Sequence, residues 1–255
     1  MPDLSRRTAL ISLGAAALTG AVVTGTAASA SAATAPTSQP NRTVTVHLVR
    51  HGQTWMNRAG RIQGWADSPL TEAGVDVARK VGRNLAAEIG GFDAAYSADM
   101  TRHFDTASGI LSAAGSPHTA TRIAGLREVA YGGWEGEKQS TAYPTLFGAV
   151  KGDTLADLID AFGTTNPVPS AATESWQEVA DRMNAALTSA VTDRRLPMRH
   201  GGSILAVSSG MSIMCLLESL GAEVPEPLEN GAVSRIVYAR GVWSVEKVGD
   251  TSYAE

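Results

Sequence analysis

The sequence has little of what typifies a disulfide-stabilised, nucleic-acid-binding or metal-dependent protein. It contains one cysteine, Cys215, which has no second cysteine with which to form an internal disulfide. A formal net charge of −4, without a basic run or an aromatic ladder, argues against nucleic-acid binding. No group of His, Cys and Asp residues has metal-ligand spacing, so we expect neither a metal nor another cofactor. An anionic ligand would have to be bound by a local group of cations.

The first 32 residues have the pattern of an export signal. The run Ser5-Arg6-Arg7 is a twin-arginine pattern, and an uncharged alanine-rich stretch follows it. Two small-x-small cleavage sites end the stretch, Ala28-Ser29-Ala30 and Ala30-Ser31-Ala32. The stretch is rich in Ala, Gly and Thr, which makes its hydrophobicity marginal for a permanent membrane anchor. We predict a removed Tat-type signal peptide at 1–32, a flexible Thr/Ser/Pro-rich linker at 33–42 and one domain at 43–255. The mature protein would be secreted and free of the membrane.

An apolar run that stops at Arg50-His51-Gly52 is the centre of the domain. Residues 43–49 predict a buried strand, and such strands deliver reactive groups to the carboxyl edge of an open α/β sheet. Arg50 offers a planar fork of donors that suits phosphate oxygens. His51 offers an imidazole nitrogen that can act as base, ligand or nucleophile. Gly52 would let the backbone turn sharply and let a ligand approach closely.

The rest of the domain alternates between strand and helix patterns. Thr71 predicts the N-cap of a helix that runs to about Glu88, and Ser175 with Glu178 forms a capping box for a second long helix to about Val191. Residues 137–173 show only weak helical fragments, such as 155–162, which is typical of a lid or specificity loop. The other elements that we expect are strands at 92–97, 119–123 and 203–207, helices at 99–113 and 211–220, and a hairpin of 233–239 with 242–248.

Several motifs in order along the chain resemble one known family. They are Arg50-His51-Gly52-x-Thr54-x-x-Asn57, then Gln63-Gly64 with Asp67-x-Pro69-Leu70-Thr71, then Tyr96-Ser97 with Arg102 and Thr106-Ala107, and finally Leu126-x-Glu128 with Trp134-Glu135-Gly136. Together they resemble the histidine phosphatase superfamily, the phosphoglycerate mutase-like proteins. The resemblance covers nearly all of 43–248. It implies a three-layer α/β/α sandwich with a mostly parallel sheet and a site at the carboxyl ends of the strands.

The resemblance also implies roles for particular residues. His51 would be phosphorylated during turnover, while Arg50 and Arg102, assisted by Asn57, would hold the phosphoryl oxygens. Glu128 would protonate the leaving alcohol, for which it would have to be protonated near neutral pH. Glu135 is the competitor for that role, although its motif favours a structural part.

The sequence departs from the family pattern at Ser208-Ser209-Gly210. The family has Ser-His-Gly there, so Ser209 stands at the position of a second histidine that binds the transferring phosphoryl group. The Ser209 hydroxyl and the N–H groups of the helix that follows Gly210 could still donate to phosphate, but they supply no side-chain charge. Among the other histidines, His47, His118 and His200 are not convincing replacements. His103 neighbours Arg102 on a helix where consecutive residues face different ways, and its case stays open.

These observations predict a secreted phosphomonoester hydrolase of the histidine acid phosphatase type, with reduced or specialised turnover because of Ser209. Its partner would be a small phosphorylated substrate. Two alternatives stay open: a non-catalytic phosphate-binding or interaction protein on the same scaffold, and a phosphoglycerate mutase-type phosphotransferase. Neither the natural substrate nor the oligomeric state follows from the sequence.

Overall fold

The computed structural model describes residues 42–196, 198, 201–224 and 227–255. The predicted signal peptide, the predicted linker up to residue 41, and His200 lie outside the described residues. Arg42 is 8% exposed, and its guanidinium donates to the carbonyl groups of Met198 (3.3 Å) and Val191. The side chain that precedes the first strand is therefore part of the domain's packing.

A six-stranded sheet forms the middle of the domain, with the strand order β3-β2-β4-β1-β5-β6. The strands are β1 (Thr43–Arg50), β2 (Ala94–Ser97), β3 (Thr121–Arg122), β4 (Gly202–Ser208), β5 (Val233–Ala239) and β6 (Val242–Asp250). Pairing is parallel within β3-β2-β4-β1, whereas β5 runs antiparallel to β1 and β6 antiparallel to β5. The predicted mostly parallel sheet is confirmed, and the terminal hairpin is its antiparallel edge.

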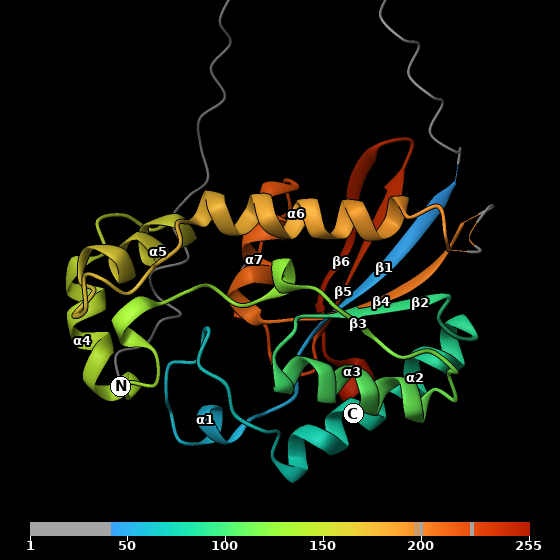
Figure 1. The fold of residues 1–255 in the computed structure, drawn as a ribbon, viewed down its shortest axis with the longest axis horizontal. Helices are drawn as coiled ribbons and strands as arrows, with labels where there is room; N and C mark the ends of the chain where they lie inside the picture. The colour runs from blue at the N-terminus through green and yellow to red at the C-terminus, as the bar shows by residue number, and fades with distance from the viewer. Residues whose placement is uncertain (1–41, 197, 199–200, 225–226) are drawn as a thin grey trace, which may run out of the picture. The chain divides into compact units, whose positions relative to one another are not determined.

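Helices cover both faces of this sheet. They are α1 (Trp55–Arg58), α2 (Glu72–Ile89), α3 (Thr101–Ala113), α4 (Gln139–Ala149), α5 (Leu155–Thr164), α6 (Trp176–Thr192) and α7 (Gly210–Ser219). Figure 1 shows α2 and α3 on one side of the strands, and α6 and α7 on the other. Consecutive strand residues point to opposite faces, so Leu48 joins the hydrophobic cluster under α6 and α7 while Val49 joins the cluster with α2 and α3. The three-layer α/β/α sandwich is therefore confirmed.

The ends of the long helices follow the sequence signals. The Thr71 side chain accepts from the Gly74 N–H at the start of α2, and Gly90 ends that helix in the left-handed conformation at φ +79°. Ser175 and Glu178 form the predicted capping box of α6. Local chemistry thus fixed where these helices begin.

The segment 137–173 contains more regular structure than its sequence indicates. The weak fragment at 155–162 is part of α5, which has a capping box between Thr154 and Asp157. The helix α4 was missed, because it has no side-chain cap, contains Pro144 and buries only Ala142 and Leu146. Its apolar residues lack the period that marks an amphipathic helix, so it is held by packing on the rest of the domain.

Candidate active site

The carboxyl ends of β1 and β4 lie side by side and carry the two central motifs. Arg50 pairs with Ser208 in the parallel register, and the N–H of His51 donates to the Ser208 carbonyl at 2.9 Å. The chain then leads from β1 to α2 on one face of the sheet, and from β4 to α7 on the other. In open α/β sheets, ligands bind at the carboxyl ends of strands whose connections lead to opposite faces in this way. His51 and Ser209 are the first residues beyond the two strand ends.

His51 is buried, neutral and held in one orientation. Its side chain is 3% exposed and its Nδ1 lies 2.8 Å from the Gly52 carbonyl. A carbonyl can only accept, so Nδ1 carries the proton and Nε2 keeps its lone pair. Burial, followed by the charges of Arg102 and Arg50, lowers the pKa of His51 well below 6.5. A neutral imidazole with a free Nε2 next to two guanidinium groups is suited to nucleophilic attack on a phosphorylated ligand.

Gly52 serves a purpose other than the one that its place in the motif predicts. It is not among the glycines with positive φ, so no left-handed turn requires it. A Cβ at Gly52 would lie 2.5 Å from the Gly74 carbonyl oxygen, and one at Gly74 would lie 2.2 Å from the Gln53 carbonyl oxygen. The two glycines allow the loop after β1 to pass directly against the first turn of α2. The close approach is thus between two backbones.

Arg102 supplies a buried charge and also fixes a loop. It is fully buried at the start of α3, and its guanidinium donates to the Gly64 carbonyl (2.6 Å), the Ala66 carbonyl (2.9 Å) and the Asp67 carboxylate (3.0 Å). Its Nε is buried and has no hydrogen-bond partner. Because a guanidinium stays charged in proteins, the positive field at His51 remains although most donors are engaged.

Glu135 holds the same loop from the other side. Its carboxylate accepts from the backbone N–H groups of Gly64, Trp65 and Ala66 at 2.7–3.0 Å, and from Tyr131 at 3.1 Å. A carboxylate with four backbone donors is engaged in positioning the chain. This geometry supports the structural part that its motif suggested.

Arg50 and Asn57 are also partly engaged. Arg50 donates through Nη1 to the Leu228 carbonyl, while its Nε is buried without a partner and faces Gly210. A Cβ on Gly210 would lie 3.3 Å from that Nε, so glycine there leaves room for the guanidinium. The Asn57 Oδ1 accepts from the Thr54 N–H in the capping box of α1. Arg50 is close to His51, whereas Asn57 is engaged at the start of a neighbouring helix.

The carboxylate of Glu128 lies against the first turn of α7. Its carboxylate accepts from the N–H groups of Ser212 (2.9 Å) and Met211 (3.2 Å) and from the Ser212 hydroxyl (3.0 Å). Arg182 and Trp65 donate to its backbone carbonyl. The N–H groups after Gly210, which the sequence assigned to phosphate, are therefore occupied in part by Glu128. This corrects that expectation, because two of the first N–H groups of α7 donate to the Glu128 carboxylate.

The structure brings a further histidine into the site, one that helical periodicity left open. His103 and Ser209 are both fully buried, and the Nε2 of His103 lies 2.7 Å from the Ser209 Oγ. The rings of His51 and His103 meet edge to face with centroids 5.2 Å apart. Consecutive helix residues diverge by about 100°, yet the first turn of α3 is enclosed so closely that Arg102 and His103 are both buried in the site.

The remaining described histidines lie elsewhere. His47 is in the middle of β1 and packs against Phe92 with ring centroids 6.1 Å apart. Burial lowers the pKa of His47 to about 4. His118 lies in the loop after α3. Among the described residues, no group of three or more His, Cys, Asp or Glu side chains could hold a metal ion.

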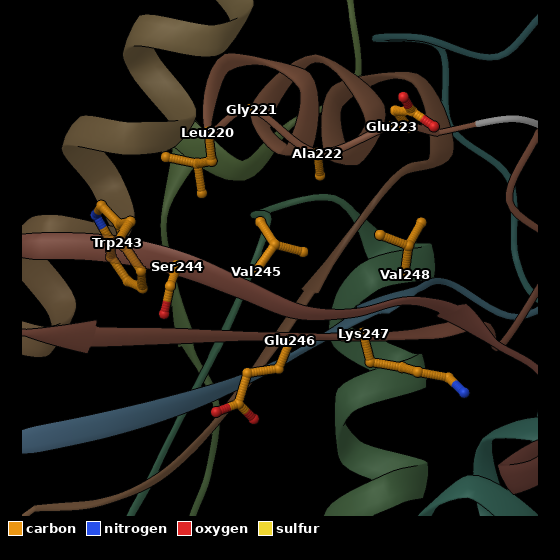
Figure 2. Close-up of a pocket in the computed structure, with 10 residues that line it drawn as sticks. All are labelled: Leu220, Gly221, Ala222, Glu223, Trp243, Ser244, Val245, Glu246, Lys247 and Val248. Carbon is orange, nitrogen blue, oxygen red and sulfur yellow. The ribbon is translucent and has the colours of Figure 1, made fainter.

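A hollow at the other end of α7 is separate from this site. Figure 2 shows it between the turn that follows α7 and strand β6, with the side chains of Leu220 and Val245 facing each other and those of Glu246 and Lys247 pointing away. Its lining residues are 220–223 and 243–248, and none of them belongs to the cluster around His51. The hollow is lined by polar as well as apolar residues, and none of them is a residue that the sequence motifs assign to the phosphate site.

Comparison with known proteins agrees with this arrangement. The model of the histidine phosphatase superfamily (branch 1) matches residues 46–251. The "Probable phosphoglycerate mutase GpmB" of Citrobacter koseri is 34% identical, over 82% of this chain and 94% of that protein. The phosphoglycerate mutase structure from Bacillus anthracis str. Sterne has 33% identity and a TM-score of 0.76, over 85% of this chain and 97% of that chain. YhfR of Bacillus stearothermophilus has 26% identity and a TM-score of 0.66, over 83% and 100%.

Proposed function

The chain belongs to the histidine phosphatase superfamily, and we propose that it hydrolyses phosphate monoesters through a phosphohistidine formed on His51. One observation carries the proposal: a buried, neutral imidazole whose Nδ1 donates to the Gly52 carbonyl, beside the charges of Arg50 and Arg102. A nucleophile of this kind needs no base, because its attacking nitrogen carries no proton.

The proposed reaction has two displacements at phosphorus. The Nε2 of His51 attacks in line, the bond from phosphorus to the ester oxygen breaks, and the departing alcohol takes up a proton. Water then attacks the phosphohistidine, releases inorganic phosphate and restores the neutral ring. Arg50 and Arg102 stabilise the charge of the phosphoryl oxygens in both steps.

Glu128 is the proposed proton donor for the leaving alcohol. In its present position the carboxylate accepts four hydrogen bonds, from the N–H groups of Val129, Met211 and Ser212 and from the Ser212 hydroxyl. To act as an acid it must carry a proton, which it passes to the ester oxygen as the bond to phosphorus breaks.

The alcohol part of the substrate is proposed to contact α4. The charge of Arg50 opposes the rise in the pKa of Tyr143 that burial causes, so this α4 side chain is within electrostatic reach of the site. The ring of Phe147 lies 5.1 Å from that of Tyr143 and is 41% exposed. An exposed aromatic side chain on this helix favours contact with an apolar or planar alcohol part. A Phe147→Ala variant should raise KM for aromatic esters more than for glycerol phosphates.

A phosphoglycerate mutase activity is the second candidate, because the relatives from Citrobacter koseri and Bacillus anthracis carry that name. A mutase returns the phosphoryl group to a phosphoglycerate and releases little phosphate, whereas a phosphatase passes it to water. Incubation with 3-phosphoglycerate, followed by ³¹P NMR, separates the two by the appearance of 2-phosphoglycerate or of free phosphate. A non-catalytic protein would do neither and would only bind phosphate.

Export is proposed with the hydrolase, since a secreted chain meets no glycolytic flux that a mutase would serve. The support is the twin-arginine pattern at Arg6-Arg7 with its cleavage sites. Within the described ranges, no helix is long and apolar enough to cross a membrane. Replacing both arginines by lysine should retain the full-length precursor in the cell, whereas equal secretion of the variant would refute the Tat route.

The direct test compares phosphate release from p-nitrophenyl phosphate by the mature chain with that by His51→Ala. Hydrolysis that requires His51 supports the phosphatase. Absence of turnover in both, with sugar phosphates and phytate also unreacted, would refute it and favour phosphate binding alone.

A further inference from the structure

The side chains of His103 and Ser209 form a closed pair next to His51. They come from α3 and from the end of β4, and each is fully buried. Ser209 occupies the N-cap position of α7, but its hydroxyl makes no capping hydrogen bond. The hydroxyl instead meets the Nε2 of His103 at 2.7 Å. A serine at an N-cap ordinarily accepts from the helix N–H groups, and here Glu128 has taken over that part.

The other nitrogen of His103 makes no hydrogen bond. This atom, Nδ1, is buried. Buried polar atoms are nearly always paired, but the core residue His47 also has an unpaired ring nitrogen, so the position of His103 beside the nucleophile is the stronger observation. The ring also stands edge to face against the nucleophile, with centroids 5.2 Å apart.

The other donors around His51 are largely engaged. Arg102 donates three hydrogen bonds to residues 64–67, and Arg50 donates to the Leu228 carbonyl. The N–H groups of Met211 and Ser212 donate to Glu128. A phosphoryl group on His51 has three equatorial oxygens that need donors, so the site calls for a further one close to the ring.

We propose that His103 and Ser209 act as one donor unit for the phosphoryl group that His51 accepts, an inference that rests on the proposed phosphatase function. The Nε2–H of His103 donates to the Ser209 Oγ, which orients the hydroxyl so that its own proton points at a phosphoryl oxygen. Ser209 is the residue that contacts the substrate, and His103 is a positioning residue that acts through it. No bond forms or breaks at either side chain.

The pair also explains how a serine can serve at the end of β4. A hydroxyl alone is a neutral donor that can rotate, whereas a hydroxyl held by an imidazole is fixed in direction before the substrate arrives. Burial, followed by the charge of Arg102 and the neighbouring His51 ring, lowers the pKa of His103 well below 6.5, so the imidazole acts as a neutral donor to the Ser209 hydroxyl. The imidazole of His103 thus supports the phosphoryl site from α3 and acts through the Ser209 hydroxyl.

The test uses variants of the full mature chain that separate the hydrogen bond from the volume of the side chain. Ser209→Ala removes one oxygen, His103→Phe keeps a ring without a donor, and His103→Gln places an amide donor near the position of Nε2. We expect Ser209→Ala and His103→Phe each to lower kcat for p-nitrophenyl phosphate about 100-fold. The double variant should be no worse than either, because the two act as a unit. The kcat of His103→Gln should be about tenfold higher than that of His103→Phe.

A second readout is the affinity for an anion at neutral pH. The affinity for tungstate, measured by calorimetry, should fall in Ser209→Ala and in His103→Phe, and it should be partly recovered in His103→Gln. His47→Leu is the matched control, because it removes another buried histidine of the same domain, away from the site. The control should keep the kcat of the wild type and its tungstate affinity.

The outcomes separate this inference from the proposed function. If wild type releases phosphate but His103→Phe and Ser209→Ala keep its kcat and tungstate affinity, the donor unit is refuted while the phosphatase stands. Additive losses in the double variant would also refute the unit. If wild type has no turnover, the phosphatase fails, and equal tungstate affinity of wild type and Ser209→Ala would then refute the donor unit as well. Should His103→Phe fail to fold, Ser209→Ala and His103→Gln decide the question.

Discussion

Two buried histidines four residues apart on the first strand differ in every respect that matters for chemistry. His47, in the middle of β1, and His51, just past its end, both have pKa values that burial lowers. His47 packs against Phe92, and its Nε2 has no partner. His51 has its Nδ1 fixed by the Gly52 carbonyl and lies next to two guanidinium groups and a second imidazole. Burial is common to both, so the neighbours at the strand end distinguish a reactive histidine from a core histidine.

The largest effect that separates the two should come from removing each ring in turn. His51→Ala deletes the nucleophile and should lower kcat/KM for p-nitrophenyl phosphate by at least about 10⁴-fold. His47→Leu deletes a core imidazole and should change kcat/KM by less than about threefold, since it touches no part of the site. Steady-state kinetics on the two purified variants check this. Equal losses in both would mean that His51 is not the nucleophile.

The charge pair near His51 and the one near His47 should differ almost as much in their effects on activity and stability. The Arg102–Asp67 pair at the site is buried on the arginine side, and Arg102→Ala should lower kcat about 10³-fold and destabilise the fold by about 3 kcal/mol. Near His47, Arg235 pairs with Glu88 at 3.1 Å, with 35% and 45% of the side chains exposed. Glu88→Gln should therefore cost less than about 1 kcal/mol.

Urea unfolding and steady-state kinetics measure both variants. An Arg102→Ala protein with normal stability and low kcat would mean that the ties to residues 64–67 matter less than the charge. A variant with normal kcat would contradict the role of Arg102 altogether.

Glu128 has two functions, the proposed proton donation to the leaving alcohol and hydrogen bonding at the start of α7, and Glu128→Gln should lower both kcat and stability. Glu128→Gln cannot donate a carboxyl proton, so kcat for an alkyl phosphate should fall about 100-fold. The loss for p-nitrophenyl phosphate should be far smaller, because p-nitrophenolate leaves without protonation. Replacing a carboxylate at the α7 N-terminus should also lower stability by about 1 kcal/mol. A plot of log kcat against the pKa of the leaving group provides the measurement, and equal losses for both substrate types would contradict the acid role.

The smallest effects are on pH dependence. The folded pKa of His47 is about 4 and its ordinary value is 6.5, so between these pH values the unfolded chain binds more protons than the folded one. This histidine therefore lowers the free energy of unfolding as the pH falls from 6.5 to 4, by up to roughly 3 kcal/mol, and has no further effect below 4. His47→Leu should make the stability curve flatter in this window, as urea titrations at several pH values would show.

The pKa of His51 is lowered in the same direction, and this should appear in the pH dependence of kcat/KM. Because its pKa lies well below 6.5, the acid limb of kcat/KM should fall at a pH lower than that of an ordinary histidine. An acid limb centred at or above pH 6.5 would contradict a buried neutral nucleophile.

The sequence predicted those parts of the site that depend on one strand end or one helix start. A strand that stops at Arg50-His51 has one place to deliver these side chains, and Thr71, Ser175 and Glu178 carry their capping signals within a few residues. The position of His103 depends on which elements surround the first turn of α3. Periodicity gives the angle between neighbouring side chains on a helix, but it does not give what lies on either side.

Two further features depended on long-range contacts in the same way. The N–H groups of α7 belong to Glu128, which lies 84 residues before Ser212 in the chain. The helix α4, with its interior Pro144 and no cap, is formed by packing, so local propensity could not reveal it. Sequence patterns are informative where structure is local, and the donors of this site are assembled from distant segments.

The most direct test of the account asks whether the phosphoryl group is carried by His51. The mature chain would be mixed rapidly with an excess of p-nitrophenyl phosphate, quenched in alkaline denaturant, which preserves phosphohistidine, and digested for mass spectrometry. The account predicts a phosphoryl group on the peptide that contains His51, labile to acid and absent from His51→Ala. Turnover with no phosphorylated His51 peptide at millisecond sampling, or with the label on another residue, would contradict it.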